Sequence, residues 1–158
     1  MPTLNDLKAE IDIYARKYRH PDLAPFKENG LYDLYPENNV STPGVVSMWP
    51  EPFPSLNEAG VYAFLSQDLE VLYIGKASMS HGLGYRLSSY CSYGENKSCK
   101  LNHKWIGRPR YIFTVAMPME TKFEAPGLEE YLIGKIPTDN NKAGAIYSSG
   151  TEPFTESK

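Results

Sequence analysis

One segment of this chain has the charge pattern of a phosphate-binding surface. Between Lys76 and Arg110 there are seven basic residues and one acidic residue, whereas the whole 158-residue chain has a net charge of −3. A basic segment in an acidic chain can bind phosphate groups. The common alternative is a solvated loop whose charges pair with acidic neighbours, and the residues alone leave both interpretations open.

Rings are interleaved with these charges at Tyr93, His103 and Trp105. A nucleic-acid contact needs this mixture, because cations hold the phosphate backbone and rings stack on bases. The candidate nucleic-acid contacts are Lys97, Lys100, Lys104, Arg108 and Arg110.

Cys91, Cys99 and His103 raise the question of a zinc site. Their spacing is not that of a standard structural site and a fourth ligand is not obvious, so we expect free thiols. Two cysteines are also too few for a disulfide framework. The first residues lack the regions of a signal peptide, and no apolar run reaches the ~18–20 residues of a membrane span. We therefore expect a cytoplasmic protein in a reducing compartment.

The elements that must position any site lie in the second half of the chain. Residues 60–65 and 70–75 are rich in β-forming residues, and the short turn between them requires antiparallel pairing. The pattern then predicts a helix, a third strand and a second helix, over residues 83–91, 111–116 and 128–136. A polar, basic connection is expected over residues 92–109.

The N-terminal part combines a predicted helix with a proline-rich irregular segment. Residues 3–19 predict a helix, with a capping box of Thr3 and Asp6 and an apolar stripe at three- and four-residue spacing. The stripe either covers the core, which is the commoner outcome, or forms the seam of a homodimer. Residues 21–57 are rich in proline and aromatics and predict an irregular wrap around the domain. We expect an extension over 1–57, a domain over 58–145 and a loosely held tail over 146–158.

Two short motifs and their order point to a family. Gly60-Val61-Tyr62, followed by Tyr73-Ile74-Gly75, resembles the two signatures of the GIY-YIG nucleases, with Val61 in place of the usual Ile. Further motifs follow in the same order, namely Arg86 in the first helix, Leu128–Ile133 in the second, and Pro137–Asn140 after it. One such motif alone would mean little, whereas several in order make a specific match over roughly residues 58–145.

The resemblance implies an α+β fold with a small three-stranded antiparallel sheet flanked by helices, here preceded by an N-terminal helical extension. It also implies a Mg²⁺- or Mn²⁺-dependent endonuclease that hydrolyses double-stranded or branched DNA. A restriction enzyme or small stand-alone nuclease fits this chain best, because little room remains for a further DNA-binding domain. The alternative is a catalytically inert nucleic-acid-binding module that keeps the same fold.

The resemblance assigns a role to each motif residue. Glu129 is the metal ligand, since one carboxylate suits a Mg²⁺ ion that keeps several waters. Arg86 contacts the scissile phosphate through its planar fork. Tyr62 is the candidate general base or water-positioning group, and Tyr73 bonds the attacking water or a phosphate oxygen. A phenol is a poor base at its ordinary pKa of ~10, so cationic help from Lys76 or the metal is expected.

Two details of the second helix remain open. The family asparagine is Asn140 or its neighbour Asn141, and it is expected to orient the end of the helix that carries Glu129. Pro126 and Gly127 predict that this helix begins close to Glu129, which would shift the carboxylate from its usual place.

Overall fold

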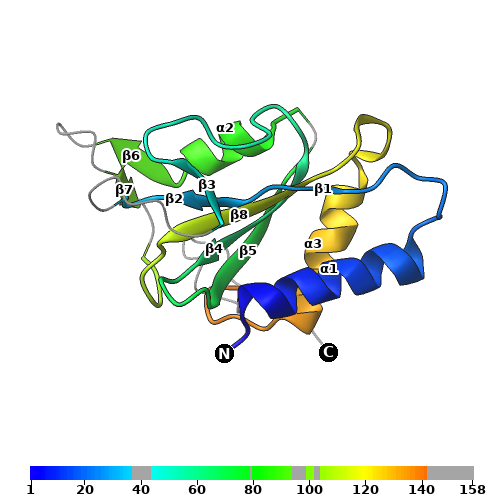
Figure 1. Cartoon of the computed structure of the whole chain (residues 1–158), viewed down its shortest axis with the longest axis horizontal. Helices are drawn as coiled ribbons and strands as arrows, with labels where there is room; N and C mark the ends of the chain where they lie inside the picture. The colour runs from blue at the N-terminus through cyan, green and yellow to red at the C-terminus, as the bar shows by residue number, and fades with distance from the viewer. Residues whose placement is uncertain (37–43, 79, 94–98, 102–103, 142–158) are drawn as a thin grey trace, which may run out of the picture.

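The computed structural model describes residues 1–36, 44–78, 80–93, 99–101 and 104–141. Within these residues the chain forms a mixed six-stranded sheet with helices on both faces, and a separate two-stranded sheet (Figure 1). The elements are α1 (Leu4–Tyr18), β1 (Lys27–Glu28), β2 (Leu31–Asp33), β3 (Val45–Met48), β4 (Gly60–Leu65), β5 (Val71–Ala77), α2 (Leu83–Ser88), β6 (Cys91–Tyr93), β7 (Cys99–Leu101), β8 (Tyr111–Ala116), the 3-10 turn η1 (Met119–Thr121) and α3 (Glu124–Lys135).

The strand order of the large sheet is β3-β2-β8-β4-β5, with β1 paired to β8. Strand β4 pairs antiparallel with both β5 and β8, whereas β2 and β3 are parallel to each other. Strand β5 is therefore an edge strand, and the backbone groups on its outer side have no strand partner within the described residues. This edge becomes the wall of the candidate site.

The expectation of a three-stranded antiparallel sheet is wrong. The three predicted strands are present as β4, β5 and β8, but the sheet continues beyond β8 through three short strands from residues 27–48. These strands are two to four residues long. Runs so short show no alternation of apolar and polar residues, which is why the segment reads as irregular chain. The free edge of β8 supplies the partner that local sequence does not reveal.

Helix α1 begins with the predicted capping box, in which the Thr3 side chain accepts from the Asp6 N–H and Asp6 accepts from the Thr3 N–H. Its buried residues Leu4, Leu7 and Ile11 pack into the core with α3. The Arg19 guanidinium also pairs with Glu124 at 2.8 and 2.9 Å. The first part of the apolar stripe therefore covers the core of its own chain, whereas Tyr18 at its end is exposed.

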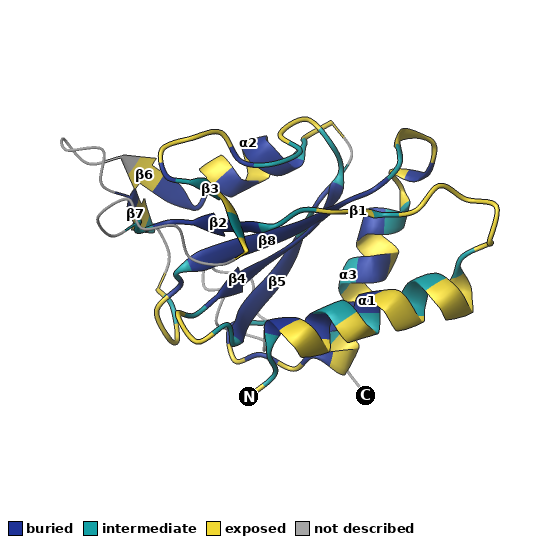
Figure 2. Ribbon diagram, in the orientation of Figure 1, coloured by how far each residue is buried: buried dark blue, intermediate teal, exposed yellow. Residues whose placement is uncertain are grey.

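Alternation along the central strands fills two separate cores. Val61, Ala63 and Leu65 of β4 face α1 and α3, whereas Tyr62 and Phe64 face α2. Every residue of β4 and β8 is buried, as the dark strands of Figure 2 show. A strand covered on both faces lies inside a three-layer domain, so side chains that reach the surface for chemistry must come from its edge.

Helix α3 begins at Glu124 rather than near Glu129, so the expectation of a late start is also wrong. Pro126 lies in the first turn, where a helix tolerates proline because the missing N–H would have no intrahelical partner. Glu129 therefore sits inside a formed helix. Two other bounds differ from expectation. Helix α2 ends at Ser88, and the connection that follows it contains β6 and β7.

No helix in the described part of the chain combines the length and apolar character needed to cross a membrane. The predicted tail over 146–158 and the contact candidate Lys97 lie outside the described residues.

Candidate active site

A hollow of about 690 Å³ lies along the outer edge of β5. Four of the six predicted catalytic residues line it. They are Tyr73, Lys76, Arg86 and Glu129. Tyr73 and Lys76 come from β5 itself, Arg86 comes from α2 on one face of the sheet, and Glu129 comes from α3 on the other. An edge strand is the place where helices from opposite faces can present side chains to one space.

Glu129 is a half-buried carboxylate among cations. Burial raises the pKa of Glu129, the positive charges of Lys76 and Arg86 act to lower it, and Glu130 adds to the rise, so the net pKa lies above the ordinary value. Burial of a charged carboxylate is unfavourable unless an opposite charge or a metal compensates it. Glu130 is exposed on the same helix. The two neighbouring acids therefore differ in environment, and only Glu129 lines the hollow.

Tyr62 and Tyr73 belong to a network of three phenols completed by Tyr90. The hydroxyl oxygens of Tyr62 and Tyr90 are 2.7 Å apart, and the Tyr90 hydroxyl donates to that of Tyr73 at 3.4 Å. Because Tyr90 donates its proton to Tyr73, the short bond is satisfied with Tyr62 as the donor. The three rings also contact one another, with centroids 5.7 to 6.2 Å apart.

The network changes the role open to Tyr62. Its side chain is 1% exposed and does not line the hollow. Burial, then the neighbouring phenols Tyr90 and Tyr73, raise the pKa of Tyr62 far above its usual value, and Arg86 offsets this only in part. Burial and Tyr90 raise the pKa of Tyr73 in the same way. Both phenols keep their protons at neutral pH, which argues against Tyr62 as a general base and favours hydrogen-bond donation.

Tyr90 is the functional candidate that sequence reasoning missed. The helical spacing placed it on the apolar face of the helix over 83–91, with no role beyond packing. The available signal was its distance from Arg86, since residues four apart share one face of a helix. The Arg86 guanidinium carbon lies 5.6 Å from the centroid of the Tyr90 ring.

Arg86 keeps its charge firmly. Burial acts to lower the pKa of Arg86, but interactions with Tyr62, including a side-chain hydrogen bond, and with Tyr90 and Tyr73 raise it overall. The side chain is exposed at the mouth of the hollow. A permanently charged, planar guanidinium at this point suits a phosphate oxygen pair.

The two asparagines divide the task predicted for one. The Asn140 side chain donates to the carbonyls of Leu72 and Ile106 and is 2% exposed. The Asn141 side chain accepts from the Ile74 N–H and donates to the Ile74 carbonyl, both at 2.8 Å. Of the two, only Asn141 lines the hollow.

The Asn141 side chain thereby satisfies the outward backbone groups of Ile74 at the free edge of β5. Backbone groups of residues two apart in a strand face the same side. Because the Ile74 N–H and carbonyl point outward to Asn141, the N–H and carbonyl of Lys76 point outward as well, toward the hollow. The site therefore offers a main-chain donor beside the Lys76 ammonium, whose own partner is the Ser78 hydroxyl at 3.1 Å.

The predicted nucleic-acid contacts do not act as one group. Lys100, Lys104 and Arg108 are exposed, and Arg108 lies 5.6 Å from the centroid of the Tyr35 ring. Arg110 instead forms a bidentate pair with the buried Asp33 at 2.8 and 3.1 Å. None of these four residues lines the hollow. Arg110 therefore has a structural role, because its charge compensates the buried Asp33 carboxylate.

Cys91 and Cys99 are buried free thiols, and His103 lies outside the described residues. Among the described residues, no group of three or more His, Cys, Asp or Glu side chains could hold a metal ion. Among the described residues that line the hollow, Glu129 is the one carboxylate. A single carboxylate beside open space fits Mg²⁺ or Mn²⁺, which take their remaining ligands from water and substrate. It does not fit a closed structural zinc site.

No family model, curated protein or solved structure matches this chain.

Proposed function

We propose that this chain is a member of the GIY-YIG nuclease family and that it hydrolyses phosphodiester bonds of DNA in the hollow beside β5, with Mg²⁺ or Mn²⁺. One observation carries the proposal. One hollow is lined by the motif residues Tyr73, Arg86 and Glu129 and by Lys76, which directly follows the second motif, although the four belong to three different elements. The combination of one carboxylate, two cations and a phenol suits a metal-assisted reaction on a phosphate.

Arg86 and Lys76 bind the scissile phosphate in this proposal. The Arg86 guanidinium donates to two phosphate oxygens, and the Lys76 ammonium, a compact positive charge, neutralises negative charge on a third oxygen. The outward N–H of Lys76 adds a fixed donor of the kind that stabilises developing negative charge. Tyr73, which keeps its proton, donates to a phosphate oxygen or orients the attacking water.

Glu129 would hold the metal ion. When bound, such an ion lowers the pKa of a coordinated water and neutralises charge on the phosphate. The raised pKa of Glu129 reflects the burial of its charge, and a cation at this carboxylate would stabilise the ionised form. Asn141, by tying residues after α3 to Ile74, keeps the α3 side of the hollow in register with β5.

The test is Mg²⁺-dependent cleavage of plasmid and branched DNA by wild type, Glu129→Gln and Glu130→Gln. The two variants remove the same charge from adjacent positions of one helix, but only Glu129 lines the hollow. Glu129→Gln is expected to lower the rate by about a hundredfold or more, the scale of losing one strong electrostatic contact to a transition state. Glu130→Gln should cleave like wild type.

Equal rates for Glu129→Gln and wild type would refute the assignment of the metal ligand. DNA binding by a well-folded wild type that cleaves nothing with any divalent metal would instead identify the inert binding module.

A further inference from the structure

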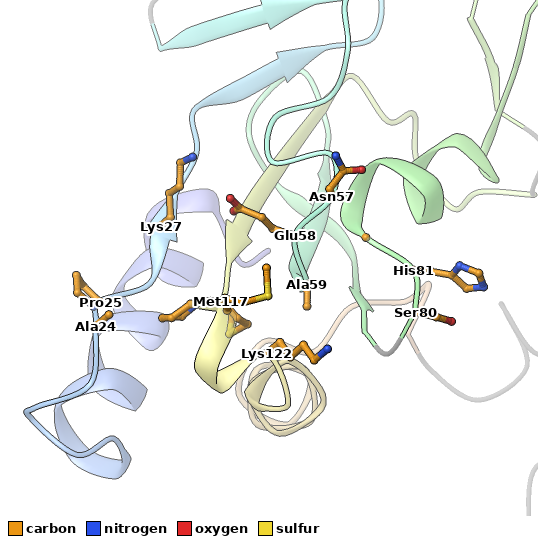
Figure 3. Close-up of a pocket in the computed structure, with 13 residues that line it drawn as sticks. Ala24, Pro25, Lys27, Asn57, Glu58, Ala59, Ser80, His81, Met117 and Lys122 are labelled. Atoms are coloured by element: carbon orange, nitrogen blue, oxygen red, sulfur yellow. The ribbon is translucent and has the colours of Figure 1, made fainter.

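A second hollow, of about 460 Å³, lies at the end of the sheet where β8 ends and β4 begins (Figure 3). His81 lines both this hollow and the one that holds Arg86 and Glu129. The two spaces therefore adjoin across one side chain. Nothing in the proposed reaction uses the second hollow, although its size is that of a small-molecule site.

Its lining combines an apolar middle with cations at two sides. Met117 is buried beneath the space and Pro25 borders it. In Figure 3, Lys27 stands on one side, and the Lys122 ammonium points toward the segment of Ser80 and His81. Both lysines are exposed, and no described carboxylate forms an ion pair with either. An apolar floor between lysines suits a flat heterocycle that carries a phosphate.

His81, which lines both hollows, stacks on Tyr85, which lines neither of them. The ring of His81 lies on that of Tyr85, with centroids 4.1 Å apart and planes inclined by 16°. Tyr85 is 63% exposed and directly precedes Arg86 on α2. Exposed stacked rings beside a phosphate-binding arginine are what a nucleobase needs as a platform.

We propose that the second hollow receives one unstacked nucleotide of the DNA strand, next to the phosphate held by Arg86. The inference rests on the proposed function and adds its substrate class. The base enters the space over Met117 beside the His81–Tyr85 stack, and flanking phosphates meet Lys122 and Lys27. A base in a paired duplex cannot reach such a space without leaving its stack, at a cost that an unpaired base avoids. The preferred substrate is therefore DNA with an unpaired nucleotide beside the cleaved bond.

Glu58 supplies a selective contact. It is the acidic residue of the lining, and in Figure 3 its carboxylate points into the space between Lys27 and Met117. A carboxylate accepts from the exocyclic amino group of cytosine, adenine or guanine, whereas an unpaired thymine offers only its ring N3–H. Bases with an amino group should therefore be favoured over thymine.

The experiment compares one duplex with the same duplex carrying a single bulged nucleotide, measuring both cleavage with Mg²⁺ and binding in EDTA. Ala24→Trp fills the hollow from an exposed position in its lining, and Lys27→Ala/Lys122→Ala removes its cations. Gln67→Trp, in the exposed turn at the other end of β4, and Lys17→Ala, on α1, are the matched controls.

Wild type should cleave the bulged duplex at least about tenfold faster than the paired one, in line with the stacking contribution of one base. Ala24→Trp should cleave the bulged and the paired duplex at similar rates, whereas Gln67→Trp should keep the preference for the bulged duplex. The lysine double variant should reduce the slope of log affinity against log salt by about two, because each lysine neutralises one phosphate of the DNA backbone. Lys17→Ala should leave that slope unchanged.

Equal wild-type rates on the two duplexes, or a preference that survives in Ala24→Trp, would overturn the subsite while leaving the nuclease proposal in place. Bulge-selective binding that Ala24→Trp abolishes, without cleavage by wild type, would support the subsite and overturn the nuclease proposal. Failure of wild type to bind either DNA would overturn both.

Discussion

The phenol ring of Tyr62 lies directly over Gly75 of the neighbouring strand, so that a Cβ at position 75 would stand 2.5 Å from both Cζ and Oη of the tyrosine. The two residues are register partners in β4 and β5. The glycine of the second motif is thus required by the tyrosine of the first, because only a residue without a side chain leaves room for the ring that carries the phenol network.

Gly75→Ala should displace the Tyr62 ring and disturb the bond between Tyr62 and Tyr90. We expect a loss of about 1–3 kcal/mol in the free energy of unfolding, the scale of overpacking in a core, together with reduced cleavage. Urea unfolding and cleavage rates measure the two effects. Gly134→Ala is the control, since a Cβ there meets no atom within 4 Å and alanine favours a helix. Unchanged stability in Gly75→Ala would contradict the close contact.

Tyr62 and Tyr90 should be energetically coupled. Tyr90→Phe removes the hydroxyl that lies 2.7 Å from that of Tyr62. The buried Tyr62 hydroxyl then loses this partner, which should lower the free energy of unfolding by about 1–3 kcal/mol. The Tyr62→Phe/Tyr90→Phe double variant should lose less stability than the sum of the single variants, because both unpaired groups are then gone. Unfolding free energies of the three variants complete the cycle. Additive losses would show that the short hydrogen bond contributes nothing.

Glu129→Gln should stabilise the protein at neutral pH in the absence of metal. The pKa of Glu129 is raised in the folded state, so the folded protein holds this proton more tightly than the unfolded chain does. The resulting stability is full below the unfolded pKa of ~4.3 and is lost as pH rises through the folded pKa. When unfolding is measured in EDTA at pH 4 and pH 7.5, the free energy of unfolding of Glu129→Gln should exceed that of wild type only at the higher pH.

Glu130→Gln should show no such difference between the two pH values. A variant Glu129→Gln that is less stable than wild type at pH 7.5 would indicate that Lys76 and Arg86 compensate the charge more than burial disfavours it.

Substitution of Arg110 should lower stability, whereas substitution of Lys104 should change DNA binding. Arg110→Met leaves the 1%-exposed Asp33 without its bidentate partner, which typically costs about 3–5 kcal/mol for a buried pair. Lys104→Ala changes an exposed side chain and should act on the salt dependence of DNA affinity instead. Thermal unfolding and salt titrations of binding distinguish the two. An Arg110→Met variant that keeps its melting temperature and loses DNA affinity would reverse the assignment.

Local sequence was enough to predict the strands β4 and β8 to the residue, the pairing of β4 with β5, and the capped helix α1. These features depend on neighbours along the chain. A short turn forces antiparallel pairing, and a capping box joins residues three apart. The motif residues Tyr73, Arg86 and Glu129, and Lys76 directly after the second motif, were also predictable, because each motif is local even though the hollow they line is not.

The size of the sheet, the network through Tyr90 and the role of Asn141 depend on the folded structure. Strands β1 and β2 form because the edge of β8 offers backbone partners, and β3 then pairs with β2. No local propensity records that edge. Tyr90 meets Tyr62 across 28 positions of sequence, and Asn141 meets Ile74 across 67. Contacts at such separations depend on how the layers pack, so the same residues read as plain packing and turn residues until the fold brings them together.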